Sequence, residues 1–358
     1  AANSTADSNT GLGYAALGSN TTGTSNTAAG VNAMVTNTTG TQNVAVGEQA
    51  LYGNTTASYN TAVGYDALRA NTTGAKNTAV GNNALDANTT ASNGTAVGYS
   101  ALVANTTGDS NTAVGYNVLG ANTTGTGNTA VGHNTLDANT TAHNNSAFGY
   151  NALTASTTAE SSVAVGSQAL AACTTGSSNT CVGQSAGNVI TTGSNNVCIG
   201  YDTDTSANDS VNSITIGIGI TSEANGTFTF GTSAGAVHNH FGTNASWDRP
   251  SDQRLKKNIN NATLGLSFIN DLRPVTYNWK ANTELDSSDS QLAHLYDKDT
   301  NNMDTSTTMH GLLAQEVKTA LNTAGVSTFG GWSESSKGVQ CISREMFVIP
   351  LIKAVQEL

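Results

Sequence analysis

Small apolar residues alternate with polar ones in a short segment that recurs through the first two thirds of the chain. In a typical copy, Asn77-Thr-Ala-Val-Gly81, the alternation predicts a short strand with Thr78 and Val80 on one face and Asn77, Ala79 and Gly81 on the other. The glycine recurs every 17 residues without slippage, at positions 13, 30, 47, 64, 81, 98, 115, 132, 149, 166, 183, 200 and 217. A fixed period of this size indicates a solenoid whose coils stack on one another.

Stacking the repeats produces two apolar rows. The β-branched residues of the segment form one stripe, which includes Val46, Val63, Val80, Val97, Val114 and Val131. The second row comprises Leu17, Met34, Leu51, Leu68, Leu85, Leu102, Leu119, Leu136, Leu153 and Leu170. The small residues suit a narrow coil interior, and strands about 4.8 Å apart give a rod roughly 60 Å long. A long valine stripe left in water would promote aggregation, so we expect three rods to pack stripe to stripe as a homotrimer.

An Asn-Thr-Thr motif also recurs once per coil, at Asn20, Asn37, Asn54, Asn71, Asn88, Asn105, Asn122 and Asn139. As a turn it would hold its asparagine in the left-handed region or in a ladder of stacked amides. Two functional alternatives are ice binding by flat threonine ladders and glycan attachment at Asn-x-Thr. The motif changes at Ser156, Cys173 and Ile190. We interpret this as decay of the ladder, which favours a structural role.

Composition and charge separate the chain into two parts. Residues 1–217 hold ten acidic and two basic side chains, whereas residues 251–358 hold twelve and ten. The net charge of −11 makes nucleic-acid binding unexpected. The sequence contains no run of about 18 apolar residues, so we expect no membrane-spanning helix. The four cysteines are too scattered for a disulfide framework. Cys181 and Cys198 fall at equivalent positions of adjacent coils, where a disulfide is conceivable but two packed thiols are favoured.

The region after residue 250 has the pattern of a mixed α and β domain. We expect a helix ended by Pro274, a strand over Val275–Trp279, a polar loop over 281–308, a helix from the Gly311 region to about Leu321, and a hairpin after Trp332. The tail has the 4-3-4 apolar spacing of a helical seam that needs partners, at Phe347, Leu351, Ala354 and Leu358. That helix should start or bend at Pro350.

A His-x-His pair lies between the repeats and this domain. In an extended segment His238 and His240 point the same way. A threefold axis would then gather six imidazoles, a set that suits octahedral Fe, Ni or Zn. The arrangement resembles the metal-bound knots of phage tail fibre tips and spikes. The alternative is a polar hairpin exposed to solvent, and no cofactor is otherwise expected.

Four motifs follow in order after the pair: SDQRLKKN (251–258), VTYNWK (275–280), GLLAQEV (311–317) and IPLIKAVQEL (349–358). Together they resemble the intramolecular chaperone domain of phage tail spikes and endosialidases, the S74 self-cleaving peptidase family. The resemblance implies a trimeric folding clamp that removes itself after assembly, with Ser251 as nucleophile and Lys256 as base. The repeat pattern resembles the head repeats of YadA-like trimeric adhesins, which implies a left-handed parallel β-roll.

The chemistry of such a cleavage can be written for the residues at the junction. The Ser251 hydroxyl reaches the Pro250 carbonyl through a five-membered ring, Lys256 takes the proton, and water resolves the ester. This breaks the Pro250–Ser251 bond, whereas relatives are also described as cutting on the other side of the serine. Lys257 is the alternative base. Lysine acts as a base only when desolvated, so we expect cleavage to wait for trimerisation.

The sequence therefore predicts a mainly β chain: a trimeric left-handed parallel β-roll of 17-residue coils over 1–231, a neck over 232–250, and a small α+β chaperone over 251–358 that ends in a helical trimerisation segment. The expected function is that of a virion tail-fibre protein, assembled in the host cytoplasm. Its partners would be two further copies, other tail or baseplate proteins and a host surface receptor, for which a glycan is one candidate. The alternatives are a bacterial trimeric surface adhesin and an ice-binding solenoid with a non-cleaving cap.

Overall fold

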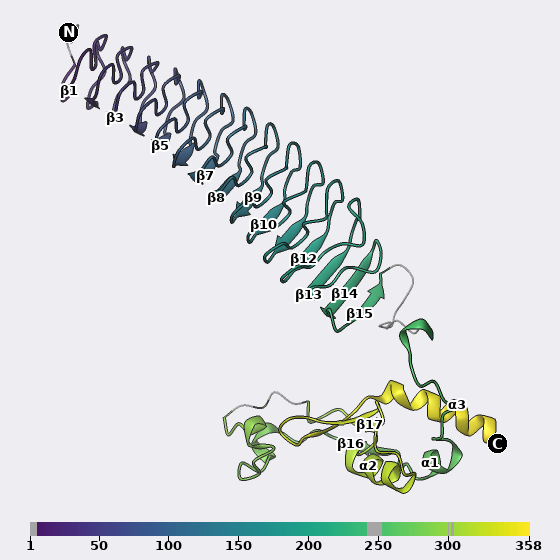
Figure 1. The fold of residues 1–358 in the computed structure, drawn as a ribbon. Coiled ribbons are helices and arrows are strands. Elements are labelled where there is room, and N and C mark those ends of the chain that lie inside the picture. The colour runs from purple at the N-terminus through teal and green to yellow at the C-terminus, as the bar shows by residue number, and fades with distance from the viewer. Residues whose placement is uncertain (1–5, 242–252, 300, 302–303) are drawn as a thin grey trace. The chain divides into compact units, whose positions relative to one another are not determined.

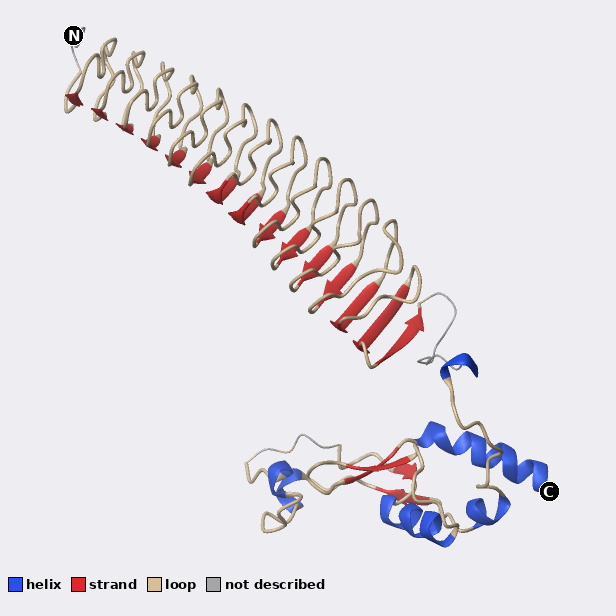
Figure 2. Ribbon diagram, viewed as in Figure 1, coloured by secondary structure: helices blue, strands red, loops and turns tan. Residues whose placement is uncertain are grey.

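The structure is a computed structural model that describes residues 6–241, 253–299, 301 and 304–358. The chain divides into two compact units, residues 1–250 and residues 251–358. The first unit is a β-solenoid with one short strand in each coil and turns on the opposite side (Figures 1 and 2). The predicted solenoid of 17-residue coils is confirmed.

The strands of the solenoid form one sheet of 15 strands in chain order. The first 14 pair in parallel, from β1 to β14. Their bounds are β1 (Thr10–Leu12), β2 (Thr27–Ala29), β3 (Val44–Val46), β4 (Thr61–Val63), β5 (Thr78–Val80), β6 (Thr95–Val97), β7 (Thr112–Tyr116), β8 (Thr129–His133), β9 (Ser146–Phe148), β10 (Val163–Val165), β11 (Thr180–Val182), β12 (Val197–Ile199), β13 (Ile214–Ile218) and β14 (Thr227–Thr232). The last strand, β15 (Gly235–His240), runs antiparallel to β14.

The predicted division of each strand into an inner and an outer face is also confirmed. Ala79 is fully buried and stacks on Ala62 and Ala96 of the neighbouring coils. The outer stripe remains partly open, with 36% of Val80, 39% of Phe148 and 43% of Phe230 exposed. An apolar stripe therefore runs along the outer face of the sheet from the first coils to the last strand pair.

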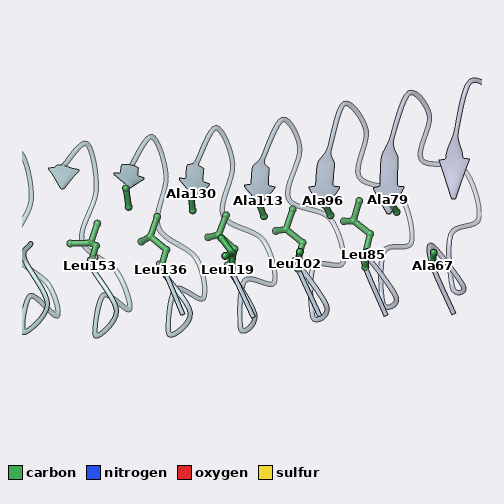
Figure 3. Packing of buried hydrophobic residues seen from close by; sticks show 14 of the residues in the cluster. Ala67, Ala79, Leu85, Ala96, Leu102, Ala113, Leu119, Ala130, Leu136 and Leu153 are labelled. Atoms are coloured by element: carbon green, nitrogen blue, oxygen red, sulfur yellow. The ribbon is translucent and has the colours of Figure 1, made fainter. Parts of the chain in front are cut away.

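The leucine row fills the interior of the solenoid opposite the alanine column, and Figure 3 shows the two rows facing each other. The backbone at these leucines lies in the left-handed region, with a φ of 52° at Leu68 and 53° at Leu102. That conformation costs about 1–2 kcal/mol for a residue with a Cβ. A buried leucine side chain contributes about 1.5–3 kcal/mol, so burial offsets the unfavourable backbone.

The periodic glycine is required where successive coils approach most closely. The φ of Gly81 is 138°, and a Cβ added there would lie 2.2 Å from the carbonyl oxygen of Gly98 in the next coil. No side chain fits that gap without moving the coils apart. The unbroken glycine register thus follows from the stacking distance of the coils.

Two ladders of buried asparagines hold the turns together. In the first, Asn71 Nδ2 donates to Asn54 Oδ1 at 3.0 Å and to the Gly74 carbonyl at 3.0 Å, and its own Oδ1 accepts from Asn88 at 2.8 Å. In the second, the Asn60 side chain accepts the Asn77 backbone N–H at 2.9 Å. Buried amides in a periodic stack satisfy one another, so these polar residues can line the interior without a desolvation penalty. Of the two turn geometries considered, the asparagine ladder is the one observed.

The cysteines of the solenoid are buried free thiols, as predicted. Cys181 and Cys198 are direct partners on β11 and β12. The hydrogen bond with Cys198 and burial raise the pKa of the Cys181 thiol, and burial raises the pKa of Cys173 to about 11. The three thiols fill space in the core, and Cys173 and Cys181 remain protonated at neutral pH.

The C-terminal unit combines short helices with two small hairpins. Its elements are the 3-10 turn η1 (Gln253–Leu255), α1 (Leu266–Asn270), β16 (Val275–Tyr277), η2 (Asn282–Glu284), η3 (Ala293–Leu295), β17 (Met309–Gly311), α2 (Ala314–Thr323), β18 (Trp332–Glu334), β19 (Gln340–Ile342), η4 (Arg344–Phe347) and α3 (Val348–Glu357). β16 pairs antiparallel with β17, and β18 with β19. Every element expected from the sequence is present, although α1 and β16 are shorter than expected.

A small core holds this unit together. Leu264 and Phe268 of the α1 segment pack with Val317, Ala320 and Leu321 of α2. The Phe268 ring stacks on Phe347 with centroids 6.3 Å apart. No helix in the described part of the chain is long and apolar enough to cross a membrane.

Candidate functional site

The predicted cleavage junction lies at the boundary between the two units. The structure places the division between residues 250 and 251. Pro250 and Ser251, the expected scissile residue and nucleophile, are outside the described residues. Of the predicted dyad only Lys256 is described, so its distance to the serine stays untested.

Lys256 directly follows the turn η1, and its backbone N–H donates to the Gln253 carbonyl at 3.1 Å. The side chains of Lys256 and Lys257 are both exposed, and Asn258 adopts the left-handed region with a φ of 55°. A lysine acts as a general base once it is desolvated. As described, Lys256 is exposed and so differs from the covered base that the prediction requires.

The C-terminal helix α3 has two different faces. Pro350 and Ala354 are buried, and the N–H of Leu266, the first residue of α1, donates to Glu357 Oε2 at 2.6 Å. Pro350 lies in the first turn, where its missing N–H costs no helical hydrogen bond. The predicted seam is therefore split: Phe347 and Ala354 pack within the chain, whereas Leu351 and Leu358 are 52% and 89% exposed.

A groove that the sequence reasoning missed lies on the same unit. Its volume is about 610 Å³, and its walls come from β16, the start of α2, β19 and η4. Its apolar lining includes Tyr277, Trp279, Leu313 and Ile342, and Arg344 is its charged residue. The alternating Val-Thr-Tyr-Asn-Trp segment was the available signal, because it leaves an aromatic pair on one face of a two-stranded sheet.

The His-x-His pair lies on β15, inside the segment expected to be the neck. The rings of His238 and His240 are edge to face, with centroids 6.3 Å apart. His238 pairs with Thr229, which continues the inner alanine column through Thr215, whereas Val237 pairs with Phe230 of the outer stripe. Both imidazoles therefore lie on the inner side of the sheet.

This orientation links the metal prediction to the packing prediction. Rods packed by their outer stripes would direct His238 and His240 away from the shared axis, so stripe packing and a six-imidazole axial site exclude each other at β15. Among the described residues, no three His, Cys, Asp or Glu side chains gather into a possible metal site within one chain. The axial Fe, Ni or Zn stays an untested prediction.

The prediction about the threonines of the Asn-Thr-Thr motif, which form two columns along the shaft, has to be corrected. Only the asparagine of the motif is replaced in the later coils, and the two threonines continue unbroken to Thr191 and Thr192. The first column is structural, because Thr89 Oγ1 donates to the Thr106 carbonyl at 3.1 Å and equivalent bonds recur along the rod. The second column, such as Thr90 and Thr107, is exposed. The expectation that the threonine ladder decays was wrong.

Glycan attachment at the motif is incompatible with the folded shaft. Asn88 is fully buried, and both hydrogens of its Nδ2 are donated, to Asn71 Oδ1 at 2.8 Å and to the Ala91 carbonyl at 3.1 Å. A transferase cannot reach a buried amide whose donors are occupied. The Asn-x-Thr pattern here is therefore a structural one.

Comparison with known families identifies the C-terminal unit. Residues 251–326 match the family Peptidase S74, chaperone of endosialidase. The match begins at the first residue of the second compact unit, and it confirms the family resemblance for this part of the chain. A chaperone of this family implies trimer folding at the end of a β-solenoid fibre. Searches of curated proteins and of solved structures returned no match.

Proposed function

We propose that this chain is a tail-fibre protein of a virus, in which the C-terminal unit directs assembly of three chains and then cuts the polypeptide near Ser251. The solenoid is the shaft that remains. A host surface receptor and the tail or baseplate are its proposed partners.

One observation carries this proposal: the S74 match starts at residue 251, where the compact units divide and the solenoid has ended. A folding clamp that is later discarded has to be separable from the shaft without breaking the core of either part. A cut at this boundary leaves both cores intact, because each core cluster lies within its own unit.

The proposed reaction uses only groups at the junction. Ser251 Oγ attacks the Pro250 carbonyl carbon and passes its proton to Lys256 Nζ; the C–N bond then breaks, and the leaving nitrogen takes the proton. The product is an ester between the Pro250 acyl group and Ser251 Oγ, with a free amine on Ser251. Water hydrolyses that ester to a Pro250 carboxylate and regenerates the hydroxyl.

Assembly provides the switch in this scheme. Lys256 is exposed in the isolated chain, and general-base catalysis by lysine needs a desolvated amine. A neighbouring subunit that covers the junction would supply this environment. Cleavage would then follow correct trimer formation and would leave a shaft whose stability is kinetic.

Denaturing mass spectrometry of the freshly expressed full chain tests the cleavage. The wild type should give fragments of about 250 and 108 residues, as expected from the unit boundary, and Ser251→Ala and Lys256→Ala should stay intact. Lys257→Ala is the matched control, because it removes an equally exposed neighbouring amine and should still cleave. An intact wild type that is trimeric by light scattering would refute self-cleavage and leave a permanent trimerisation cap.

Ice binding is the second candidate, because the exposed threonine column is unbroken over 11 coils from Thr22 to Thr192. The first threonine column argues against ice binding, because its hydroxyls donate hydrogen bonds to backbone carbonyls. Thermal hysteresis of the purified chain, compared with that of a Thr90→Lys, Thr107→Lys double variant, distinguishes ice binding from a purely structural role of the threonines. Hysteresis that the variant abolishes would support ice binding, and none would remove this candidate.

A further inference from the structure

Helix α3 carries more apolar surface than its own chain covers. Between 49% and 64% of each of five side chains on the helix is exposed, and the following Leu358 is 89% exposed. The five are Val348, Ile349, Leu351, Ile352 and Val355. At about 100° per residue, these positions together span an arc of roughly 180° around the helix. The apolar stripe of a coiled-coil helix is narrower than this arc. A helix with so wide an arc is better buried in a groove that surrounds it than against a single neighbouring helix.

Contacts on the other side of the helix hold the arc outward, and within its own unit Ile349 and Ile352 line a hollow with Asn261 and Ala262. Its opposite side holds the buried residues Pro350 and Ala354, α1 packs against α3, and Glu357 accepts a hydrogen bond from the backbone N–H of Leu266. Glu357 also pairs with Lys353 at 3.2 Å, on the side away from the arc. The arc itself therefore carries no charged side chain.

The groove beside β16 and β19 has matching properties. Trp279 and Leu313 are 47% and 40% exposed, and the Tyr277 and Trp279 rings meet edge to face at 5.4 Å. Arg344, its charged residue, donates to the Tyr277 hydroxyl at 3.4 Å. An uncharged helix arc can cover the apolar part of this groove of about 610 Å³ while Arg344 keeps its hydrogen bond to the Tyr277 hydroxyl.

We infer that the groove is the receptor for α3 of a second copy of this chain. Each copy presents one helix and one groove, so the contact is heterologous, and a heterologous contact closes into a ring when its rotation permits. Three copies joined helix to groove would form the cyclic clamp. This inference rests on the proposed trimeric function and specifies how the trimer is held.

The chain contains its own probe for this arrangement. Of the four cysteines, all within the described ranges, Cys341 alone is exposed, and it lies in the groove wall. A disulfide that links two copies through Cys341 and a cysteine introduced on the α3 arc therefore reports that the helix of one copy meets the groove of another.

The experiment uses the full chain with Ser251→Ala, so that both units stay linked. Ile349→Cys, Leu351→Cys, Ile352→Cys and Val355→Cys are made singly, oxidised with diamide and separated on a denaturing non-reducing gel. Head-to-tail contacts pair Cys341 with the new cysteine at all three interfaces, so at least one variant should give a covalent trimer. Adding Cys341→Ser should abolish that band. The parent, with Cys341 alone, provides the background.

The remaining outcomes overturn the inference in distinguishable ways. If α3 instead meets α3 on the axis, the new cysteines pair two at a time, and a covalent dimer forms that Cys341→Ser leaves unchanged. A trimer by light scattering with no Cys341-dependent band in any variant excludes the groove. A monomer before oxidation refutes the trimeric function itself, and with it this inference.

Discussion

The first of the two asparagine ladders ends at Asn139, and this leaves two buried polar atoms without partners. Ser156 stands where the repeat has asparagine. In the described structure neither Ser156 Oγ nor Oδ1 of Asn139, in the preceding coil, has a hydrogen bond. Each such atom costs about 1–3 kcal/mol. Ser156→Asn should therefore stabilise the shaft, although most substitutions at buried sites destabilise.

The magnitude follows from the neighbouring coil. Asn139 Nδ2 donates to Asn122 Oδ1 at 2.7 Å and to the Ala142 carbonyl at 3.3 Å. An asparagine at 156 would bond Asn139 Oδ1 and the Ala159 carbonyl in the same way. Two unpaired atoms are removed, and one is created where the new Oδ1 faces Cys173. The expected net gain is about 1–2 kcal/mol.

Thermal unfolding of the full chain measures this gain, at about 2–4 °C per kcal/mol for a domain of this size. Ser156→Ala is the matched control, because it removes the unpaired hydroxyl without adding a ladder bond. The difference between the two variants isolates the amide bond. An asparagine variant no more stable than the alanine variant would refute the argument that ladder continuity stabilises the turns.

Two further predictions concern the interior. Leu102→Ala empties a fully buried site and should cost about 2–5 kcal/mol in urea unfolding, and a loss under about 1 kcal/mol would mean that the neighbouring side chains collapse into the cavity. Burial raises the pKa of Asp204 to about 6 from 3.8, so the folded state holds this proton more tightly than the unfolded chain. Its contribution is complete below about pH 4 and is lost as pH rises through about 6. Melting temperatures at pH 4.5 and 7.5 should therefore show a smaller loss with pH in Asp204→Asn than in the wild type, and equal slopes would contradict the assignment.

The shaft is predictable because one pattern specifies it many times over. The glycine register follows from close coil contact, and the alternation of Ala79 with Val80 separates the inner from the outer face. The backbone of the turns is not predictable in the same way. Residues with ordinary side chains, such as Asp66, Leu68 and Lys76, adopt positive φ there. Local preference argues against that conformation, and only the burial and hydrogen bonds supplied by the adjacent coils overcome it.

The C-terminal unit shows the opposite balance. Its motifs were enough to identify the family, yet the spacing of Phe347, Leu351, Ala354 and Leu358 did not reveal that α1 already covers part of the seam. A one-dimensional pattern records which residues are apolar and leaves open which neighbour buries them. For the same reason the groove was missed, because its walls come from segments more than 60 residues apart, such as Tyr277 and Arg344.

The stacking of one coil on the next also determines how the shaft responds to force. The hydrogen bonds that join coils, such as Gly81 N–H to the Val63 carbonyl, run along the rod, so tension applied to the two ends of one chain peels coils away in sequence. Each coil of 17 residues releases about 55 Å of chain when it detaches. A single shaft would thus extend in equal steps under load, and only contacts between chains would make the coils resist together.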